Sequence, residues 1–219
     1  MHAQFVLFDG FDPLDVLAPY ETLGAGGVEV SLVCAEGPRD VPSGLRGVSL
    51  RAEAVLDPAR ADLVVVPGAA GRVLAGEEDD DADDTVPARL ARTLGTSLPG
   101  LLKAAMDRPG TIVAAVCGGS HVLAGAGLIG GRHATTHVLG LDALWNAGVK
   151  VVDARVVDDG DLVTAAGVTS GLDLGLYLLE RELGPRVAHA VERLLAHERR
   201  GVVWRDAGLV PAGARGRRP

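Results

Sequence analysis

One cysteine follows an apolar, strand-like run and precedes two glycines. The run Thr111–Val116 (T-I-V-A-A-V) predicts a buried strand that ends at Cys117. Gly118 and Gly119 come directly after the thiol, and they allow a sharp turn into a helix with no side chain to crowd it. This order is typical of a nucleophile elbow. Because the dipole and free amides at the start of the helix favour a thiolate, Cys117 is predicted to be a catalytic nucleophile.

The second cysteine has a different setting. Cys34 ends the alternating run Val28–Cys34, and no glycine follows it. A free cysteine is commonly a small buried apolar residue; this interpretation is preferred for Cys34 and stays open as the alternative for Cys117. Neither cysteine has the CxxC or Cys/His spacing of a zinc site, so no metal site is indicated.

The composition is that of a globular, acidic chain. Its 219 residues are enough for one α/β domain, and 47% hydrophobic and 23% charged residues are ordinary globular values. Aromatic residues make up only 3%, which predicts a mostly aliphatic core. The formal net charge of -8 argues against a nucleic-acid partner, because such a partner requires a basic surface.

The two ends of the chain set the predicted limits of the domain. The apolar stretch Phe5–Phe8 is too short for a signal-peptide core or a membrane span, so a cytoplasmic protein with no membrane partner is expected. The tail Pro211–Pro219 is rich in Gly, Pro and Arg and has too little apolar surface to fold. We therefore predict one domain over residues 1–200 and an extension over 201–219 whose end is disordered.

Strand and helix patterns alternate through the first half of the chain. Buried strands are predicted at Gln4–Phe8, Ala61–Pro67 and Thr111–Val116, with a strand nearer the edge at Val28–Cys34. Helices are predicted over Asp12–Leu23, Val86–Met106 and Gly118–Ala126. This alternation favours a parallel sheet covered on both faces. The expected fold is α/β, a flavodoxin-like three-layer sandwich with a mostly parallel central sheet.

Two segments interrupt the alternation. Val41–Leu56 is interpreted as a hairpin-like excursion, and Lys150–Gly167 as a second one that turns at Asp158–Asp161 (D-D-G-D). The acidic run Glu77–Asp84 has no apolar face and is interpreted as a solvated loop. The chain then closes on two predicted amphipathic helices, Ser170–Leu183 and Pro185–Arg199.

Four motifs together resemble the DJ-1/PfpI superfamily. They are Leu14–Pro19 (L-D-V-L-A-P), Pro67–Gly71 (P-G-A-A-G), Ala115–His121 and Gly131–His137 (G-R-H-A-T-T-H). The resemblance extends over residues 4–183, nearly the whole predicted domain. Within the superfamily, L-D at the start of the first helix, A-T-T-H and Gly167–Asp173 (G-V-T-S-G-L-D) are most similar to the isocyanide (isonitrile) hydratase branch and its amidase-like relatives.

The resemblance implies roles for individual residues. Asp15 matches the acidic residue that, in the hydratase branch, reaches the reactive cysteine and manages protons; the alternative is a first-turn carboxylate favoured by the helix dipole. The amides of Gly68, Ala69 and Ala70 match a turn that faces the cysteine and holds developing negative charge. The amide of Gly118 is the other expected donor.

The chain departs from the hydratase branch directly after the cysteine. Where the branch has a threonine, this chain has Gly118, so a hydroxyl expected to assist the chemistry is absent. His121 is assigned to the outer helix surface or a subunit contact rather than to the thiol. His137, Val168 and Thr169 are candidates for the rim of the site, and for His137 a helix-capping role is equally open.

The resemblance implies a cysteine-dependent enzyme that acts on a small electrophile without a cofactor. The leading prediction is a hydro-lyase that hydrates an isocyanide to an N-substituted formamide, with Cys117 as nucleophile and Asp15 as acid and base. Glyoxalase-like or amidase/deglycase-like chemistry at the same cysteine is the alternative. A non-catalytic redox or ligand sensor is an alternative of another class. The resemblance also implies a homodimer.

Overall fold

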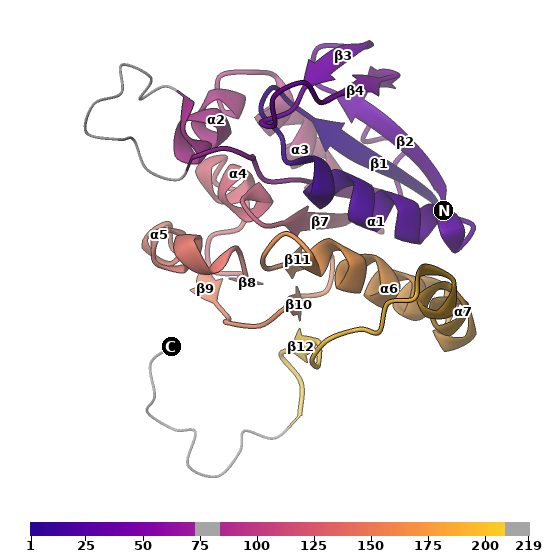
Figure 1. The fold of residues 1–219 in the computed structure, drawn as a ribbon. Helices are drawn as coiled ribbons and strands as arrows, with labels where there is room; N and C mark the ends of the chain where they lie inside the picture. The colour runs from indigo at the N-terminus through magenta and orange to yellow at the C-terminus, as the bar shows by residue number, and fades with distance from the viewer. Residues whose placement is uncertain (73–83, 209–219) are drawn as a thin grey trace.

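The computed structural model describes residues 1–72 and 84–208 of the chain. In this part of the chain a central sheet lies between two layers of helices (Figure 1). The predicted acidic loop, apart from Asp84, and the predicted disordered tail lie outside the described residues. Within the described ranges, no helix has both the length and the apolar character to cross a membrane.

Eight strands form the central sheet in the order β12-β10-β11-β7-β6-β1-β2-β5, and all neighbours are parallel except β10 and β11. All residues of β6 and β7 are buried, because helices cover both faces of the sheet. The predicted parallel sheet is confirmed, and β2 lies next to an edge strand as expected. The strands are β1 (His2–Leu7), β2 (Glu29–Cys34), β5 (Ala54–Val55), β6 (Leu63–Val66), β7 (Ile112–Val116), β10 (Val156–Asp158), β11 (Leu162–Ala165) and β12 (Trp204–Arg205).

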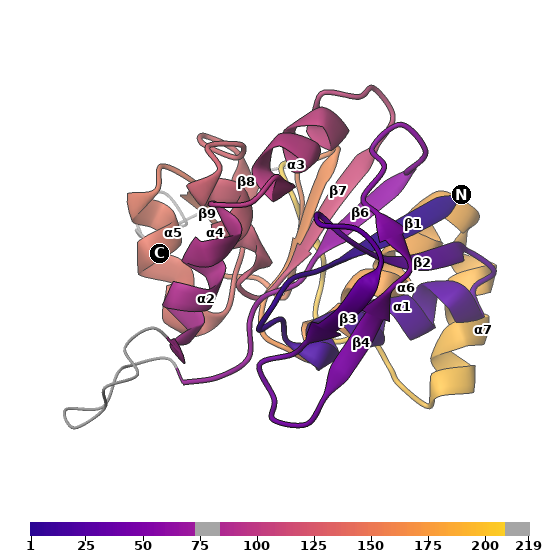
Figure 2. The ribbon, with the colours of Figure 1, turned by 90° about the horizontal axis from the view of Figure 1, so that it is seen from above.

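The helices form the two outer layers. Figure 2 shows α1, α6 and α7 on one side of the sheet and α2, α3, α4 and α5 on the other. The core between them is mostly Val, Leu and Ala, as the composition predicts, with Phe5 and Phe11 among its few aromatic residues. The helices are α1 (Pro13–Ala25), α2 (Val86–Thr93), α3 (Leu98–Met106), α4 (Gly119–Gly125), α5 (Leu141–Asn146), α6 (Ser170–Leu183) and α7 (Pro185–Leu195).

The single helix predicted over Val86–Met106 is wrong, because the structure has two helices there. α2 ends before Gly95, and α3 begins at Leu98. The Thr96 hydroxyl accepts a hydrogen bond from the amide of Leu98 at 3.1 Å, which helps to start the second helix. Pro99 in the first turn of α3 has no amide hydrogen for a bond to a preceding turn. Leucines recur at a helical spacing on both sides of this break, so hydrophobic periodicity alone does not reveal that the helix is interrupted.

Both predicted excursions contain antiparallel pairing. β3 (Arg39–Pro42) and β4 (Ser49–Ala52) form a hairpin separate from the central sheet. β10 and β11 form the second hairpin, which extends the central sheet itself. A small parallel pair, β8 (His133–Ala134) and β9 (Lys150–Val151), lies beside this second hairpin.

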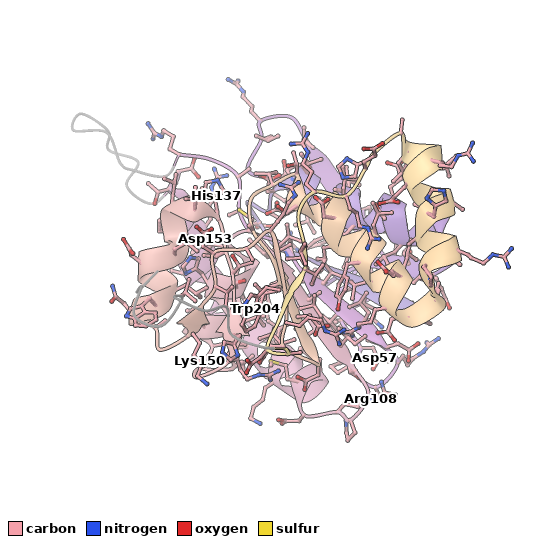
Figure 3. The ribbon with its side chains drawn as sticks, turned by 90° about the horizontal axis from the view of Figure 1, so that it is seen from below. Asp57, Arg108, His137, Lys150, Asp153 and Trp204 are labelled. Carbon is pink, nitrogen blue, oxygen red and sulfur yellow. The ribbon has the colours of Figure 1, made fainter. Side chains whose placement is uncertain are left out.

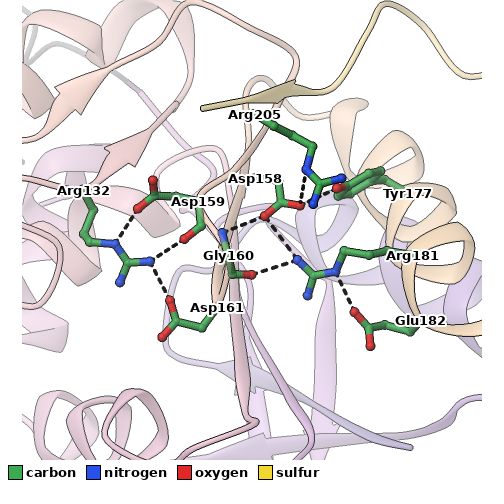
Figure 4. A network of polar contacts seen from close by, with 9 residues as sticks. All are labelled: Arg132, Asp158, Asp159, Gly160, Asp161, Tyr177, Arg181, Glu182 and Arg205. Atoms are coloured by element: carbon green, nitrogen blue, oxygen red, sulfur yellow. Dashed lines mark hydrogen bonds and ion pairs between the residues drawn. The ribbon is translucent and has the colours of Figure 1, made fainter. Parts of the chain in front are cut away.

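The chain returns to the sheet after residue 200. Trp204–Arg205 forms the edge strand β12 beside β10, so the folded unit continues past the predicted domain end at residue 200. The buried carboxylate of Asp158 anchors this return (Figure 4). It accepts hydrogen bonds from the Gly160 amide at 2.7 Å and from the Tyr177 hydroxyl. It also pairs with Arg205 at 3.3 Å. A two-residue strand has no periodicity, so the sequence pattern cannot predict it.

Candidate active site

Cys117 lies at the turn between β7 and α4 with a backbone φ of 55°. Two hydrogen bonds hold this strained residue. The Cys117 amide donates to the Ala165 carbonyl at 2.9 Å, and the Thr136 hydroxyl donates to the Cys117 carbonyl at 2.7 Å. Gly119 follows the turn because a Cβ atom there would come within 2.1 Å of the Val66 carbonyl oxygen. The sharp turn expected of an elbow is therefore present at this cysteine.

The A-T-T-H motif supports the turn through its threonines. Thr136 binds the Cys117 carbonyl, and the Ser120 hydroxyl of α4 donates to the Thr135 carbonyl at 2.7 Å. The amide of Thr135 in turn donates to the Thr164 hydroxyl at 2.9 Å, which connects the motif to β11. The sequence prediction considered only the histidine of this motif. The sequence signal that could have revealed this supporting role is the pair of adjacent threonines in the segment after the elbow helix.

Asp15 approaches the thiol from the first turn of α1. Its carboxyl is fully buried, and Oδ2 accepts a hydrogen bond from the Gly68 amide at 2.9 Å. Oδ1 has no hydrogen-bond partner among the described residues. Burial raises the pKa of Asp15 well above its ordinary value, the charge of Asp12 adds to the rise, and the Gly68 amide opposes it. Asp15 therefore keeps its proton at pH values where exposed aspartates have lost theirs.

The thiol and this carboxyl act on each other. Burial raises the pKa of Cys117, the charge of Asp15 raises it further, and the Gly118 amide lowers it by binding the sulfur. Two negative charges side by side in a buried site repel, so the pair loses its second proton much less readily than its first. A single negative charge shared by the two groups allows a proton to pass to and from a molecule bound at the sulfur.

Four backbone amides are predicted to hold negative charge near the thiol, and two of them are engaged elsewhere. The Gly68 amide binds the buried carboxylate, and the Ala70 amide donates to the Gly10 carbonyl at 3.1 Å. In the described part of the chain, neither the Ala69 amide nor the Gly118 amide donates to a backbone carbonyl. The amides of Gly68 and Ala70 therefore already have partners, although Ala70 lines the cavity, and the amides of Ala69 and Gly118 are the better candidate donors.

Arg89 of α2 supports the P-G-A-A-G turn. Its guanidinium is largely buried, and it donates to the Ala70 carbonyl at 2.6 Å and pairs with Asp84 at 2.5 Å. The side chain occupies space that glycines leave open. A Cβ atom at Gly10 would come within 2.7 Å of the Arg89 Cδ, and one at Gly44 within 2.4 Å of Nη1. Arg89 therefore connects three loops beside the site. An arginine on a short amphipathic helix gives no sign of this in the sequence.

A cavity of about 570 Å³ opens over the thiol at the carboxyl end of β7. His137 lines this cavity. In Figure 3 it lies at the opposite end of the molecule from Asp57 and Arg108, which belong to the loops that lead into β6 and β7. No lysine or arginine is among the described residues that line the cavity. Its apolar lining includes Leu45, Val86, Leu90, Leu94, Leu139 and Val168.

The predicted rim residues differ in their positions. His137 and Val168 line the cavity, and the Nδ1 atom of His137 also accepts a hydrogen bond from the Leu139 amide at 3.3 Å, so lining and capping are combined. His121 lines the cavity too, which corrects the expectation that it lies on the outer surface. Thr169 is exposed and does not line the cavity. In the described ranges no group of three or more His, Cys, Asp or Glu side chains is arranged to hold a metal ion.

The fold and this site define an α/β protein with a cysteine at a strand-to-helix elbow and a buried carboxyl beside it. The chain belongs to the DJ-1/PfpI family, whose model matches residues 1–82 and 84–181. The family predicted from the four motifs is therefore confirmed.

Individual relatives differ in their named activities. The chain is 32% identical over 195 residues to an isonitrile hydratase of Pseudomonas putida, covering 88% of this chain and 77% of that protein. It is 30% identical over 170 residues to a deglycase of Pyrococcus horikoshii, covering 75% of this chain and 89% of that protein. DJ-1beta of Drosophila melanogaster has a similar fold, with a TM-score of 0.75, 23% identity, and coverage of 90% of this chain and 98% of that one.

Proposed function

We propose that this protein is a cysteine-dependent hydro-lyase that hydrates an isocyanide to an N-substituted formamide. The observation that carries the proposal is that the buried Asp15 carboxyl and the backbone just after Cys117 both lie against Gly68, beside an apolar cavity that Cys117 lines. A Cβ atom on Gly68 would come within 2.9 Å of Asp15 Oδ2 and 2.5 Å of the Gly118 amide nitrogen. The similarity to an isonitrile hydratase over most of both chains supports the same class of reaction.

The first step would use both groups. The Cys117 sulfur attacks the terminal carbon of the isocyanide, and the protonated Asp15 carboxyl gives its proton to that carbon, which leaves a thioimidate on the cysteine. We expect the amides of Gly118 and Ala69, residues that both line the cavity, to stabilise negative charge during the attack. Water then releases the formamide and the thiolate.

The cavity also favours a class of substrate. Its lining is largely apolar and, among the described residues, lacks a cationic side chain, so it suits a neutral molecule with an alkyl or aryl substituent. A phosphorylated or carboxylated substrate would lose its hydration there without an ion-pair partner. We therefore expect apolar isocyanides to be preferred over charged ones.

The direct test is to incubate the purified protein with cyclohexyl isocyanide and to measure N-cyclohexylformamide by liquid chromatography and mass spectrometry. We expect formation of the formamide with the wild type and a loss of at least about 1000-fold with Cys117→Ala, because the covalent route is removed. Cys34→Ala, which changes the other thiol, should keep the activity. Absence of formamide with the wild type would refute the proposal.

A deglycase-like activity is the second candidate, because a deglycase is 30% identical over 75% of this chain. It would use the same thiolate to attack a carbonyl carbon of a small dicarbonyl such as methylglyoxal. Loss of methylglyoxal that depends on Cys117, without formamide formation from an isocyanide, would favour this candidate over the first.

We also infer that the chain forms a homodimer. Exposed apolar side chains lie on α1, at Leu14 and Leu17, and in the loop after β3, at Leu45 and Val48. The bridge between Phe11 and Ser43 brings the chain just before α1 next to the loop after β3, so a partner could bury both exposed groups together. Light scattering after gel filtration should give twice the chain mass, and a change of Leu14 and Leu17 to Glu should give a monomer.

A further inference from the structure

The proposed reaction needs a proton acceptor for water in addition to the carboxyl beside the sulfur. Water must attack the thioimidate from the cavity, which is the open side of the thiol. Asp15 is fully buried and does not line the cavity, so it can exchange protons with groups bonded to the carbon on the sulfur, including a hydroxyl once it has formed there, but it does not meet free water that enters from the cavity. Gly118 has no hydroxyl to orient that water. Another side chain of the cavity must do so.

We propose that Asp12 is a further catalytic residue, the general base that activates water in the second half of the reaction. This inference depends on the proposed function, because it assigns a step of the same hydration. Asp12 lines the cavity together with Cys117 and Gly118. It precedes α1 as its N-cap, three residues before Asp15, so the same short segment supplies both carboxyls.

Backbone contacts place Asp12 beside the elbow. The Asp12 amide donates to the Gly68 carbonyl at 2.9 Å. Gly68 in turn lies against the residue after the nucleophile, because a Cβ atom at Gly68 would come within 2.5 Å of the Gly118 amide nitrogen. A single residue, Gly68, therefore separates the backbone of Asp12 from the elbow. The charge of Asp12 is also close enough to raise the pKa of Cys117.

One oxygen of this carboxylate is available. Oδ1 accepts a hydrogen bond from the Leu14 amide at 2.9 Å, which caps α1. Oδ2 has no hydrogen-bond partner among the residues that the structure describes, and the side chain is only partly buried. The cap fixes the carboxylate in place, and the second oxygen can accept a proton from water in the cavity.

The other polar side chains of the cavity are less suited to this role. The Thr136 hydroxyl donates to the Cys117 carbonyl. The Nδ1 atom of His137 accepts a hydrogen bond from the backbone, so the neutral ring carries its proton on Nε2 and offers a donor. The Nε2 atom of His121 lies against Gly140, where a Cβ atom would come within 2.4 Å of it, so this nitrogen faces the protein rather than entering water.

The steps balance as follows. The Asp12 carboxylate takes one proton from water as the oxygen bonds to the thioimidate carbon, and the electrons of the C=N bond move to nitrogen. Asp12 then gives this proton to the nitrogen. The Asp15 carboxylate, which gave its proton to the same carbon in the first step, takes the proton of the new hydroxyl as C=O forms and the C–S bond breaks. The products are the formamide, the thiolate, a protonated Asp15 and an ionised Asp12.

Asp12→Asn separates this role from the helix cap, because asparagine is an equally good N-cap residue. With cyclohexyl isocyanide as the probe, we expect turnover to fall about 100-fold or more, the usual contribution of a general base. Intact-mass spectrometry should then show the thioimidate on Cys117, heavier by the mass of the isocyanide. Hydroxylamine, a nucleophile that needs no base, should release the adduct. Asp12→Ser, a second capping residue, should behave in the same way.

Glu21→Gln is the matched control, because it removes one negative charge from an exposed position of the same helix. It should keep wild-type turnover and accumulate no adduct. The inference is overturned if Asp12→Asn retains turnover within about threefold of the wild type. It is also overturned if turnover falls without an adduct while iodoacetamide alkylation of Cys117 slows in parallel. A wild type that forms no formamide would instead refute the proposed function, and the inference with it.

Discussion

Leu90 of α2 lies against Gly118, the residue directly after the elbow cysteine. A Cβ atom at position 118 would come within 2.9 Å of the Leu90 Cδ1 and 3.4 Å of the Gly68 Cα. The φ of Gly118 is -65°, which any residue adopts, so space rather than backbone conformation disfavours a larger residue here, and Leu90 would have to shift to admit one. The leucine therefore fills space that a side chain at position 118, such as a threonine, would need.

This contact predicts that the two positions are coupled. Gly118→Thr should lower the free energy of unfolding by about 1–3 kcal/mol, because the added atoms overpack the site. The double change with Leu90→Ala should be less destabilising than the sum of the single changes, as equilibrium urea unfolding would show. Leu94→Ala, at another leucine of the same cavity, is the control and should add without coupling. Additive values for the 90 and 118 pair would contradict the contact.

The elbow and the sheet could be predicted because their signals are local. The run before Cys117 is continuous and apolar, and Gly119 is required by one backbone oxygen of β6, so a short stretch of sequence contains the whole motif. The break between α2 and α3 was missed because leucines keep a helical spacing across Gly95. The strand β12 was missed because two residues carry no pattern, and an ion pair with Asp158 holds it in place.

The use of each amide and carboxyl could not be predicted in the same way. The P-G-A-A-G motif predicts that backbone amides lie near the thiol. It does not predict that the Gly68 amide binds Asp15 while the Ala69 amide stays available. The buried Arg89 depends on glycines in three loops that are distant in sequence. Such roles are set by tertiary contacts, which neither periodicity nor motif order contains.

Asp15→Asn should shift the alkylation of Cys117 to lower pH. The charge of Asp15 raises the pKa of the thiol, and the amide keeps the shape of the side chain without that charge. The rate of reaction with iodoacetamide, measured against pH, should therefore have a lower midpoint in the variant, although isocyanide turnover falls. Asp9→Asn, at an exposed site, should leave the midpoint unchanged. A higher midpoint would mean that the protonated carboxyl stabilises the thiolate.

The same carboxyl should make the protein less stable as pH rises. The pKa of Asp15 is raised in the folded chain, so above the ordinary aspartate value the unfolded chain binds fewer protons than the folded chain. The stability of the wild type should therefore fall through the interval between those two pKa values, and Asp15→Asn should gain relative to it. Urea unfolding at a series of pH values would measure the difference, with Glu21→Gln as background. A difference that is constant with pH would argue against the raised pKa.

Thr136→Val should weaken the elbow with little change in volume. It removes the hydroxyl that donates to the Cys117 carbonyl at 2.7 Å, and the loss of one buried hydrogen bond costs about 1–2 kcal/mol. Turnover should fall as well, because the backbone of Cys117 loses one of the two hydrogen bonds that hold it at the turn. Thr136→Ser keeps the hydroxyl and should restore most of both properties. Equal losses in the valine and serine variants would show that the methyl group, rather than the hydrogen bond, is what matters.

Arg89→Met should lower turnover while leaving the reactivity of the thiol unchanged. Methionine can fill part of the space between the glycines, but the Ala70 carbonyl loses its donor, at a cost of about 1–3 kcal/mol for a buried unpaired group. The Ala69 amide belongs to the supported turn, whereas Cys117 and Gly118 are held by β7 and α4.

Arg89→Lys should recover little, because an ammonium group cannot bind the carbonyl and Asp84 with the same fork. The measurements are kcat for the isocyanide and the rate of iodoacetamide alkylation, with the exposed Arg186→Met as control. A parallel fall in both rates would place the effect at the elbow itself.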